Sequence, residues 1–157
     1  MHSVADLVLE AVENSTEAGA GIIKALAEDE GGIWMIEILD DGEWVIEGDP
    51  FPEGATTKGK GRGRGLSIIW EASRGRCSLT RGEGYTQLRF RVEDDGSFGD
   101  LFHALLPVFL RNPDVWVSIR SSGVEKRFST DDLRREDAFP SDASGIRAFR
   151  AYIERQG

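Results

Sequence analysis

The chain has 157 residues, a length that favours one domain or one domain with a small appendage. Hydrophobic residues make up 39% of it, which is enough for an apolar core, so a fully disordered chain is disfavoured. Acidic residues outnumber Lys and Arg by 28 to 19, and the net charge of −9 argues against a protein that binds nucleic acid over its whole surface.

Cysteine and histidine are scarce, with one Cys and two His residues. Cys77 alone cannot form an intrachain disulfide, and so few thiols and imidazoles argue against a zinc or iron–sulfur site. No apolar run approaches the roughly 18 residues that span a bilayer, and no basic-then-apolar leader opens the sequence. We therefore expect a soluble, cytoplasmic protein with no membrane contact.

Residues 3–18 have the pattern of an amphipathic helix, with Ser3 as N-cap and Gly19 as C-terminal stop. On this helix, Glu10 and Asn14 lie one turn apart at the edge of the apolar side. Their oxygen atoms suit a hard cation and an oriented water, although such a pair is also typical of a solvated helix edge.

Two strands are expected next, at 21–28 and 33–40. In the second, apolar residues at alternate positions share one face, and Asp40 extends that face. Burying a carboxylate costs several kcal/mol unless it has a partner. An exocyclic amine such as that of adenine is one suitable donor, and Gly42 would let a flat ring approach the backbone. An ordinary Asp-Asp-Gly turn is the alternative.

Residues 41–65 are rich in glycine and lose periodicity, and an apolar helical pattern resumes from Leu66 to Ser73. A loop longer than about 15 residues in a compact domain is either functional or disordered. Glycines just before a helix offer free N–H groups to anions, so this run favours a polyphosphate ligand. A flexible basic segment that contacts nucleic acid by charge is the alternative.

The rest of the sequence predicts a hairpin with strands at 76–81 and 85–92, then a turn at 94–96 that marks a subdomain boundary. The clean alternation of the second strand predicts an antiparallel sheet with helices on one face only. The pattern after the turn predicts helices and strands at 101–110, 115–120, 125–128, 131–135 and 144–155. Four aromatic residues at periodic positions are expected in the core: Trp34, Trp70, Phe90 and Trp116.

Four segments carry a resemblance to a known superfamily: Glu10-Ala-Val-Glu-Asn14, Asp40-Asp41-Gly42, Thr56-Thr57-Lys58 and Gly63-Arg64-Gly65-Leu66. In this order they resemble the N box, first glycine box, lid threonine–lysine stretch and second glycine box of the Bergerat, or GHKL, ATP-binding fold. That superfamily joins histidine kinases, gyrase B subunits, heat-shock chaperones, mismatch-repair ATPases and anti-sigma serine kinases. The resemblance spans about residues 3–92.

A narrower resemblance covers nearly the whole chain and is carried by residues 12–20, 49–51, 99–101 and 111–115. These segments look like a small family of stand-alone ATP-binding proteins that anaerobic bacteria often encode beside iron-hydrogenase or NADH-oxidising subunits. The resemblance implies a protein partner, a redox or hydrogenase subunit, for the C-terminal part of the chain.

The resemblance also implies an architecture and its cofactors. The expected fold class is α+β: a two-layer α/β sandwich of Bergerat (histidine kinase-like ATPase) type at residues 1–95, with a small α+β C-terminal subdomain at 97–157 as the partner-binding appendage. The implied cofactors are ATP and Mg²⁺. Asn14 would hold Mg²⁺ between the phosphates, and Glu10 would be the general base of any hydrolysis.

The remaining implied roles concern the nucleotide. Asp40 would bind the adenine amine, Thr86 would help through a water molecule, and Gly42 would make room for the ring. The residues expected to face the phosphates are Thr57, Lys58, Gly63, Gly65 and Leu66.

Two features depart from the superfamily pattern. The first glycine box normally ends in a second glycine, and here that position is Trp44, whose indole could stack on the base or block it. Residues 52–55 are inserted ahead of Thr56 in the lid. We therefore expect Mg-dependent ATP binding with weak or no hydrolysis or phosphotransfer. A nucleotide-free protein-interaction module and an anti-sigma-like serine kinase are the alternatives.

Overall fold

The computed structural model describes residues 3–44, 62–93 and 98–156. Within these ranges the chain forms five helices and six strands, which confirms the predicted α+β class. The helices are α1 (Val4–Glu17), α2 (Arg62–Ser73), α3 (Leu101–Arg111), α4 (Thr130–Arg135) and α5 (Ala143–Gln156). The strands are β1 (Ile22–Glu30), β2 (Ile33–Asp40), β3 (Cys77–Gly82), β4 (Tyr85–Glu93), β5 (Asp114–Ser121) and β6 (Val124–Ser129).

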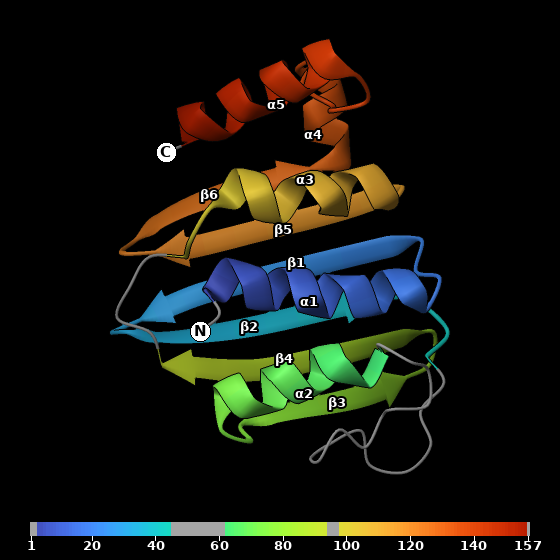
Figure 1. The fold of residues 1–157 in the computed structure, drawn as a ribbon, viewed down its shortest axis with the longest axis vertical. Coiled ribbons are helices and arrows are strands. Elements are labelled where there is room, and N and C mark those ends of the chain that lie inside the picture. Colours follow the sequence, from blue (N-terminus) through green and yellow to red (C-terminus); the bar gives the residue numbers. More distant parts are fainter. Residues whose placement is uncertain (1–2, 45–61, 94–97, 157) are drawn as a thin grey trace.

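The six strands form one sheet in the order β3-β4-β2-β1-β5-β6 (Figure 1). Every neighbouring pair is antiparallel except β1 and β5, which are parallel. The expectation of an antiparallel sheet is therefore wrong, and the sheet is mixed. The physical reason is α3, which carries the chain back along the sheet after β4, so that β5 starts at the same end as β1 (Figure 1).

The predicted subdomain boundary at 94–97 lies outside the described residues. On its two sides, β1 and β5 pair from Ile22 opposite Asp114 to Glu28 opposite Arg120. Buried apolar side chains from both parts also belong to one core cluster. The strands of the predicted N-terminal and C-terminal parts therefore share one sheet and one core, and the division into two domains stays a prediction.

Helices α1, α2 and α3 lie side by side on one face of the sheet (Figure 1). The predicted cap of α1 is confirmed, because Ser3 Oγ accepts from the Asp6 N–H and the Asp6 carboxylate accepts from the Ser3 N–H. Helix α5 packs on α3, where the Phe149 ring lies 5.9 Å from Phe102 and 5.8 Å from Phe109. The buried apolar residues of α1 and α3 belong to one cluster with those of the strands, so the core lies between these helices and the sheet.

Three of the four aromatic residues expected in the core pack there, and one does not. Trp34 and Phe90 are 1% exposed, and Trp70 packs at the edge of the core, as expected. Trp116 is 49% exposed, because its neighbours Val115 and Val117 are the residues of β5 that face the helices. The sheet face opposite the helices therefore carries a large exposed aromatic side chain.

Candidate functional site

Asp40 is a buried carboxylate at the end of β2, with 4% of its surface exposed. Its Oδ2 accepts a hydrogen bond from Ser15 Oγ at 2.5 Å, and its Oδ1 accepts one from the Gly42 N–H at 2.8 Å. The indole Nε1 of Trp44 lies 3.0 Å from both carboxylate oxygens and donates between them. Three donors therefore offset the cost of burying this charge.

Residues 41–44 are fastened to the end of α1 and the start of β1. Asp41 Oδ1 accepts hydrogen bonds from the backbone N–H groups of Gly21 and Ile22 at 2.7 and 2.9 Å. The N–H of Glu43 donates to the carbonyl oxygen of Ala18 at 2.8 Å. This short segment is thus held by the Asp41 carboxylate and by a backbone hydrogen bond, in addition to the contact between Trp44 and Asp40.

Trp44 is 8% exposed, and its indole fills the space beside the Asp40 carboxylate. Nη1 of Arg81 donates to the carbonyl oxygen of Trp44 at 2.7 Å. In the sheet, Arg81 lies opposite Thr86 on β4, and Thr86 lies opposite Asp40 on β2. Thr86, a predicted site residue, is 1% exposed and lies next to Asp40. Asp40, Thr86 and Arg81 thus form a row across three strands, and Arg81 is the residue that binds the Trp44 carbonyl.

Position 42 has no room for a side chain, because its backbone packs against Ala18. A Cβ atom at this position would lie 2.9 Å from the Cβ of Ala18, 3.0 Å from the Ala18 carbonyl oxygen and 3.1 Å from Asp40 Oδ1. The backbone of residue 42 therefore approaches the end of α1 more closely than any side chain allows. Its predicted role in making room for a base stays a prediction.

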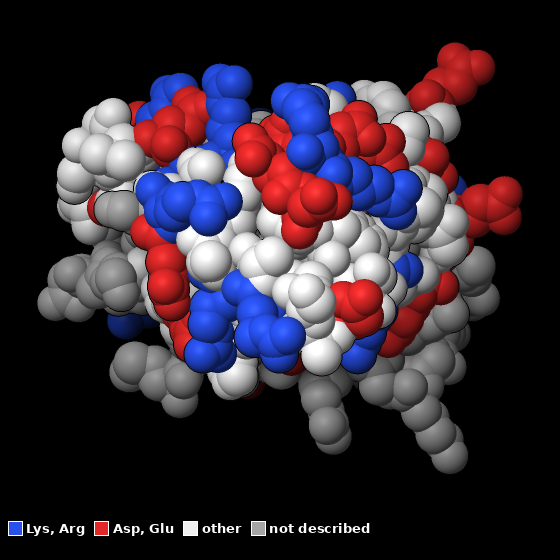
Figure 2. Space-filling model, turned by 90° about the horizontal axis from the view of Figure 1, so that it is seen from above, with Lys and Arg blue, Asp and Glu red and all other residues white. Residues whose placement is uncertain are grey.

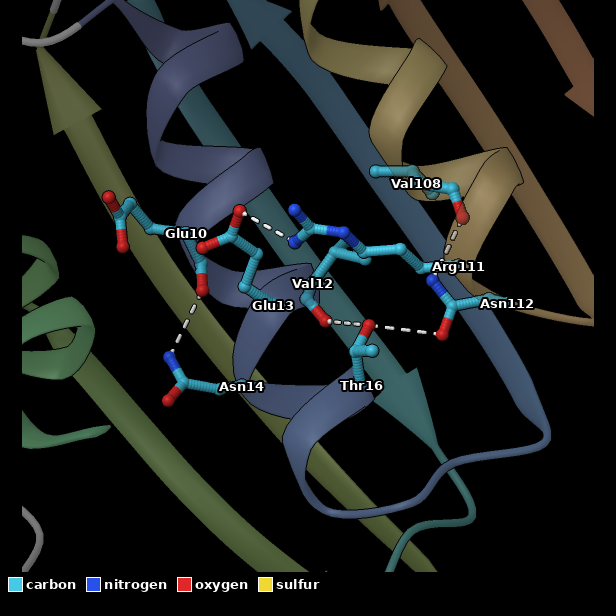
Figure 3. A network of polar contacts seen from close by, with 8 residues as sticks. All are labelled: Glu10, Val12, Glu13, Asn14, Thr16, Val108, Arg111 and Asn112. Atoms are coloured by element: carbon cyan, nitrogen blue, oxygen red, sulfur yellow. Dashed lines mark hydrogen bonds and ion pairs between the residues drawn. The ribbon is translucent and has the colours of Figure 1, made fainter. Parts of the chain in front are cut away.

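Asn14 and Glu10 project from the same side of α1, toward α2 and β4 (Figure 3). Asn14 is 7% exposed, and its Nδ2 donates to the backbone carbonyl of Glu10 at 3.1 Å, so Oδ1 is the side-chain atom suited to a cation. The next residue, Ser15, is the one that bonds Asp40, so the predicted amide and carboxylate lie at one end of the molecule. Within the described residues, no group of three or more His, Cys, Asp and Glu side chains could hold a metal ion.

Sequence reasoning missed a second polar cluster, on the side of α1 that faces α3 (Figure 3). Thr16 Oγ1 lies 3.0 Å from both the Val12 carbonyl oxygen and Asn112 Oδ1. Asn112 is 4% exposed and donates through Nδ2 to the Val108 carbonyl at 2.8 Å. Periodicity cannot pair Thr16 with Asn112, because the two residues lie 96 positions apart in the sequence. The one available signal was Asn112 itself, a polar residue directly after an apolar helix.

Gly63 and Gly65, the last two glycines of the run, lie inside a helix instead of preceding one. Helix α2 starts at Arg62, so Gly63 and Gly65 lie in its first turn and Leu66, which is 3% exposed, follows them. Free N–H groups belong to the first turn of a helix, so they come from residues earlier than Leu66. Thr57 and Lys58 lie outside the described residues.

A shallow groove of about 630 Å³ lies on the sheet face that the helices leave uncovered. Leu26 and Trp116 line it and are 48% and 49% exposed. At its rim, hydrogen bonds from Arg120 and Arg127 lower the pKa of Glu125. This groove is on the opposite face of the sheet from Asp40, so it is a separate surface.

Charges of both signs are interspersed at the end of the molecule that carries α4 and α5 (Figure 2). The described residues of that face therefore form no single-sign patch of the kind that suits nucleic acid. Among the described residues, none of the helices combines the length and apolar composition needed to cross a bilayer. No protein-family model matches the chain, and no curated protein matches it.

Proposed function

We propose that the chain binds an adenine nucleotide with Mg²⁺, in the manner of the Bergerat-fold ATPases it resembles, with weak or no hydrolysis. The observation that carries this proposal is the buried Asp40 carboxylate, set against Ser15 and Thr86 at the end of an apolar strand face. A carboxylate at such a position can select a base by accepting a hydrogen bond from its exocyclic amine. Adenine offers that amine, whereas guanine presents a carbonyl oxygen there.

The arrangement of α1 and α2 supports a phosphate position beside Asn14. The last turn of α1 and the first turn of α2 lie at the same end of the molecule (Figure 1). Free N–H groups and the positive end of the dipole of α2 favour an anion there. Asn14 Oδ1 and the phosphate oxygens would then hold Mg²⁺ together, because this ion prefers few protein ligands and several from phosphates or water.

A specific observation favours the second candidate function, a nucleotide-free interaction module. The Trp44 indole donates to both oxygens of Asp40, so a donor already occupies the carboxylate. In a chain that kept this fold without its ligand, such a donor would add to those of Ser15 and Gly42 in offsetting the cost of burying a carboxylate. The redox or hydrogenase partner and the cytoplasmic location stay predictions.

Equilibrium binding of ATP and GTP, with and without Mg²⁺, tests the proposed function. We expect wild type to prefer ATP, Asn14→Ala to lose the Mg²⁺-dependent part of the affinity, and Asp40→Asn to lose the preference for ATP over GTP. Glu37→Gln is the matched control, since it neutralises a carboxylate of β2 that pairs with Arg89 on the other sheet face. Equal affinity for ATP and GTP in wild type would contradict the adenine contact, and saturating Mg-ATP binding by Asn14→Ala would contradict the N-box role.

A further inference from the structure

The contact between Trp44 and Asp40 joins an aromatic N–H donor to the carboxylate assigned to adenine. We propose that Trp44 is an internal competitor of the base, so that an adenine nucleotide reaches Asp40 only after the indole has left it. This inference rests on the proposed function, and it adds a regulatory contact to the same site.

The hydrogen-bonding capacity of the carboxylate supports the competition. Oδ1 accepts from the Gly42 N–H and from Trp44 Nε1, while Oδ2 accepts from Ser15 Oγ and from the same indole nitrogen. A carboxylate has about four acceptor positions, and the three donors fill most of them, with the single indole N–H lying between the two oxygens. The amine of adenine is a planar donor like the indole N–H, and it would have to take over the position of that group.

The closed arrangement is held by backbone contacts of Trp44 and of the residue before it. Arg81 Nη1 fixes the carbonyl oxygen of Trp44 at 2.7 Å, and the N–H of the preceding residue, Glu43, is bonded to Ala18 at 2.8 Å. Trp44 itself is 8% exposed. Moving the indole away from Asp40 therefore exposes its buried apolar surface, and binding of the nucleotide has to offset that cost. The apparent affinity for a nucleotide is then reduced by the fraction of molecules in which the carboxylate is open.

Replacing the indole by a ring without a donor tests the inference directly. We expect Trp44→Phe to bind Mg-ATP about tenfold or more tightly than wild type, because the closed state loses a charge-assisted hydrogen bond. Adding Asp40→Asn to this variant should remove the gain. ATP should also change the tryptophan fluorescence of wild type, and that change should be lost in Trp44→Phe.

A second variant opens the site without altering the aromatic ring. Arg81→Met removes the donor to the Trp44 carbonyl, so it should raise the affinity for Mg-ATP by a smaller factor. Arg89→Met is its matched control, since it removes the same charge from a neighbouring strand where Arg89 pairs with Glu37 at 3.6 Å. The control should bind Mg-ATP with the affinity of wild type.

The outcomes separate the inference from the proposed function. If wild type, Trp44→Phe and Arg81→Met all bind Mg-ATP with one affinity, the competition is overturned while nucleotide binding stands. If none of the three binds at millimolar concentration, the proposed function is overturned together with the inference. If Trp44→Phe does not fold, the comparison of Arg81→Met with Arg89→Met decides in its place.

Discussion

Ser15 Oγ and Asp40 Oδ2 are joined by a hydrogen bond of 2.5 Å across 25 positions of sequence, and both residues are buried. The bond fixes the last turn of α1 against the end of β2. Its donor lies one residue after Asn14, so the segment that carries the proposed cation ligand is also the one that orients the proposed base-binding carboxylate.

Removing this hydroxyl should destabilise the fold. We expect Ser15→Ala to lower the free energy of unfolding by about 1.5–3 kcal/mol, because it removes a hydrogen-bond donor from a buried carboxylate oxygen. Ser121→Ala is the control, since its hydroxyl donates to the partly buried Asp29 at 3.1 Å and should contribute less. Urea denaturation measures both, and equal losses would show that burial of the Ser15–Asp40 bond adds nothing.

The close approach of Gly42 to Ala18 predicts a penalty for any side chain at position 42. We expect Gly42→Ala to lower the free energy of unfolding by about 1–3 kcal/mol, because the added Cβ meets a backbone oxygen and a packed methyl group. Gly21→Ala is the control, since its Cβ would only touch the Asp41 carboxylate at 3.7 Å. Thermal unfolding of the two variants checks this, and a neutral Gly42→Ala would contradict the packing.

The bond between Thr16 and Asn112 predicts coupling between α1 and the end of α3. Asn112→Ala should lower the free energy of unfolding by about 2 kcal/mol, because it also leaves the Val108 carbonyl unpaired. A double-mutant cycle with Thr16→Val should give a coupling energy of about 1 kcal/mol.

The neighbouring ion pair provides the control for this cycle. Arg111 and Glu13 lie 3.2 Å apart with side chains 55% and 38% exposed, so Arg111→Gln should cost less than about 1 kcal/mol. A vanishing Thr16–Asn112 coupling energy would show that the two helices are held by apolar packing alone.

Burial raises the pKa of Tyr152 on α5, which packs edge-on against Phe128 with ring centroids 6.1 Å apart. The folded protein therefore keeps its phenol proton at a pH where the unfolded chain, with a pKa of about 10, loses it. Stability from this group is complete below that pKa and falls as the pH rises through the folded value. Tyr152→Phe should flatten the alkaline decline in urea melts between pH 8 and 11 or so, and an unchanged decline would contradict the shift.

Most secondary structure could be predicted from the spacing of apolar residues, which differs between helices and strands. The alternation in β2 placed Asp40 on the buried face, and the pattern of α1 placed Asn14 at its edge. Trp116 was expected in the core because it is aromatic, although the alternation of β5 sets it on the same face as Ser118 and Arg120. The opposite face of β5 is apolar from residue 115 to residue 119, and it is the face that the structure buries.

The contacts inside the site were less predictable, because they depend on tertiary partners. The resemblance implies that Trp44 stands where the superfamily has a glycine, but only the folded chain shows its indole donating to Asp40. Helix α2 begins at Arg62, earlier than expected, because glycines lower helix propensity without forbidding a first turn. The links from Ser15 and Thr16 to distant residues follow from how α1 sits between its neighbours.

The parallel pairing of β1 with β5 has a consequence for any shortened form of the chain. A fragment that stops after β4 would leave the nine residues of β1 as an outer strand with unpaired N–H and C=O groups along one side. Such a strand is a template for pairing with other chains, so the fragment should self-associate. The C-terminal part of the chain, through β5, thus keeps one edge of β1 covered.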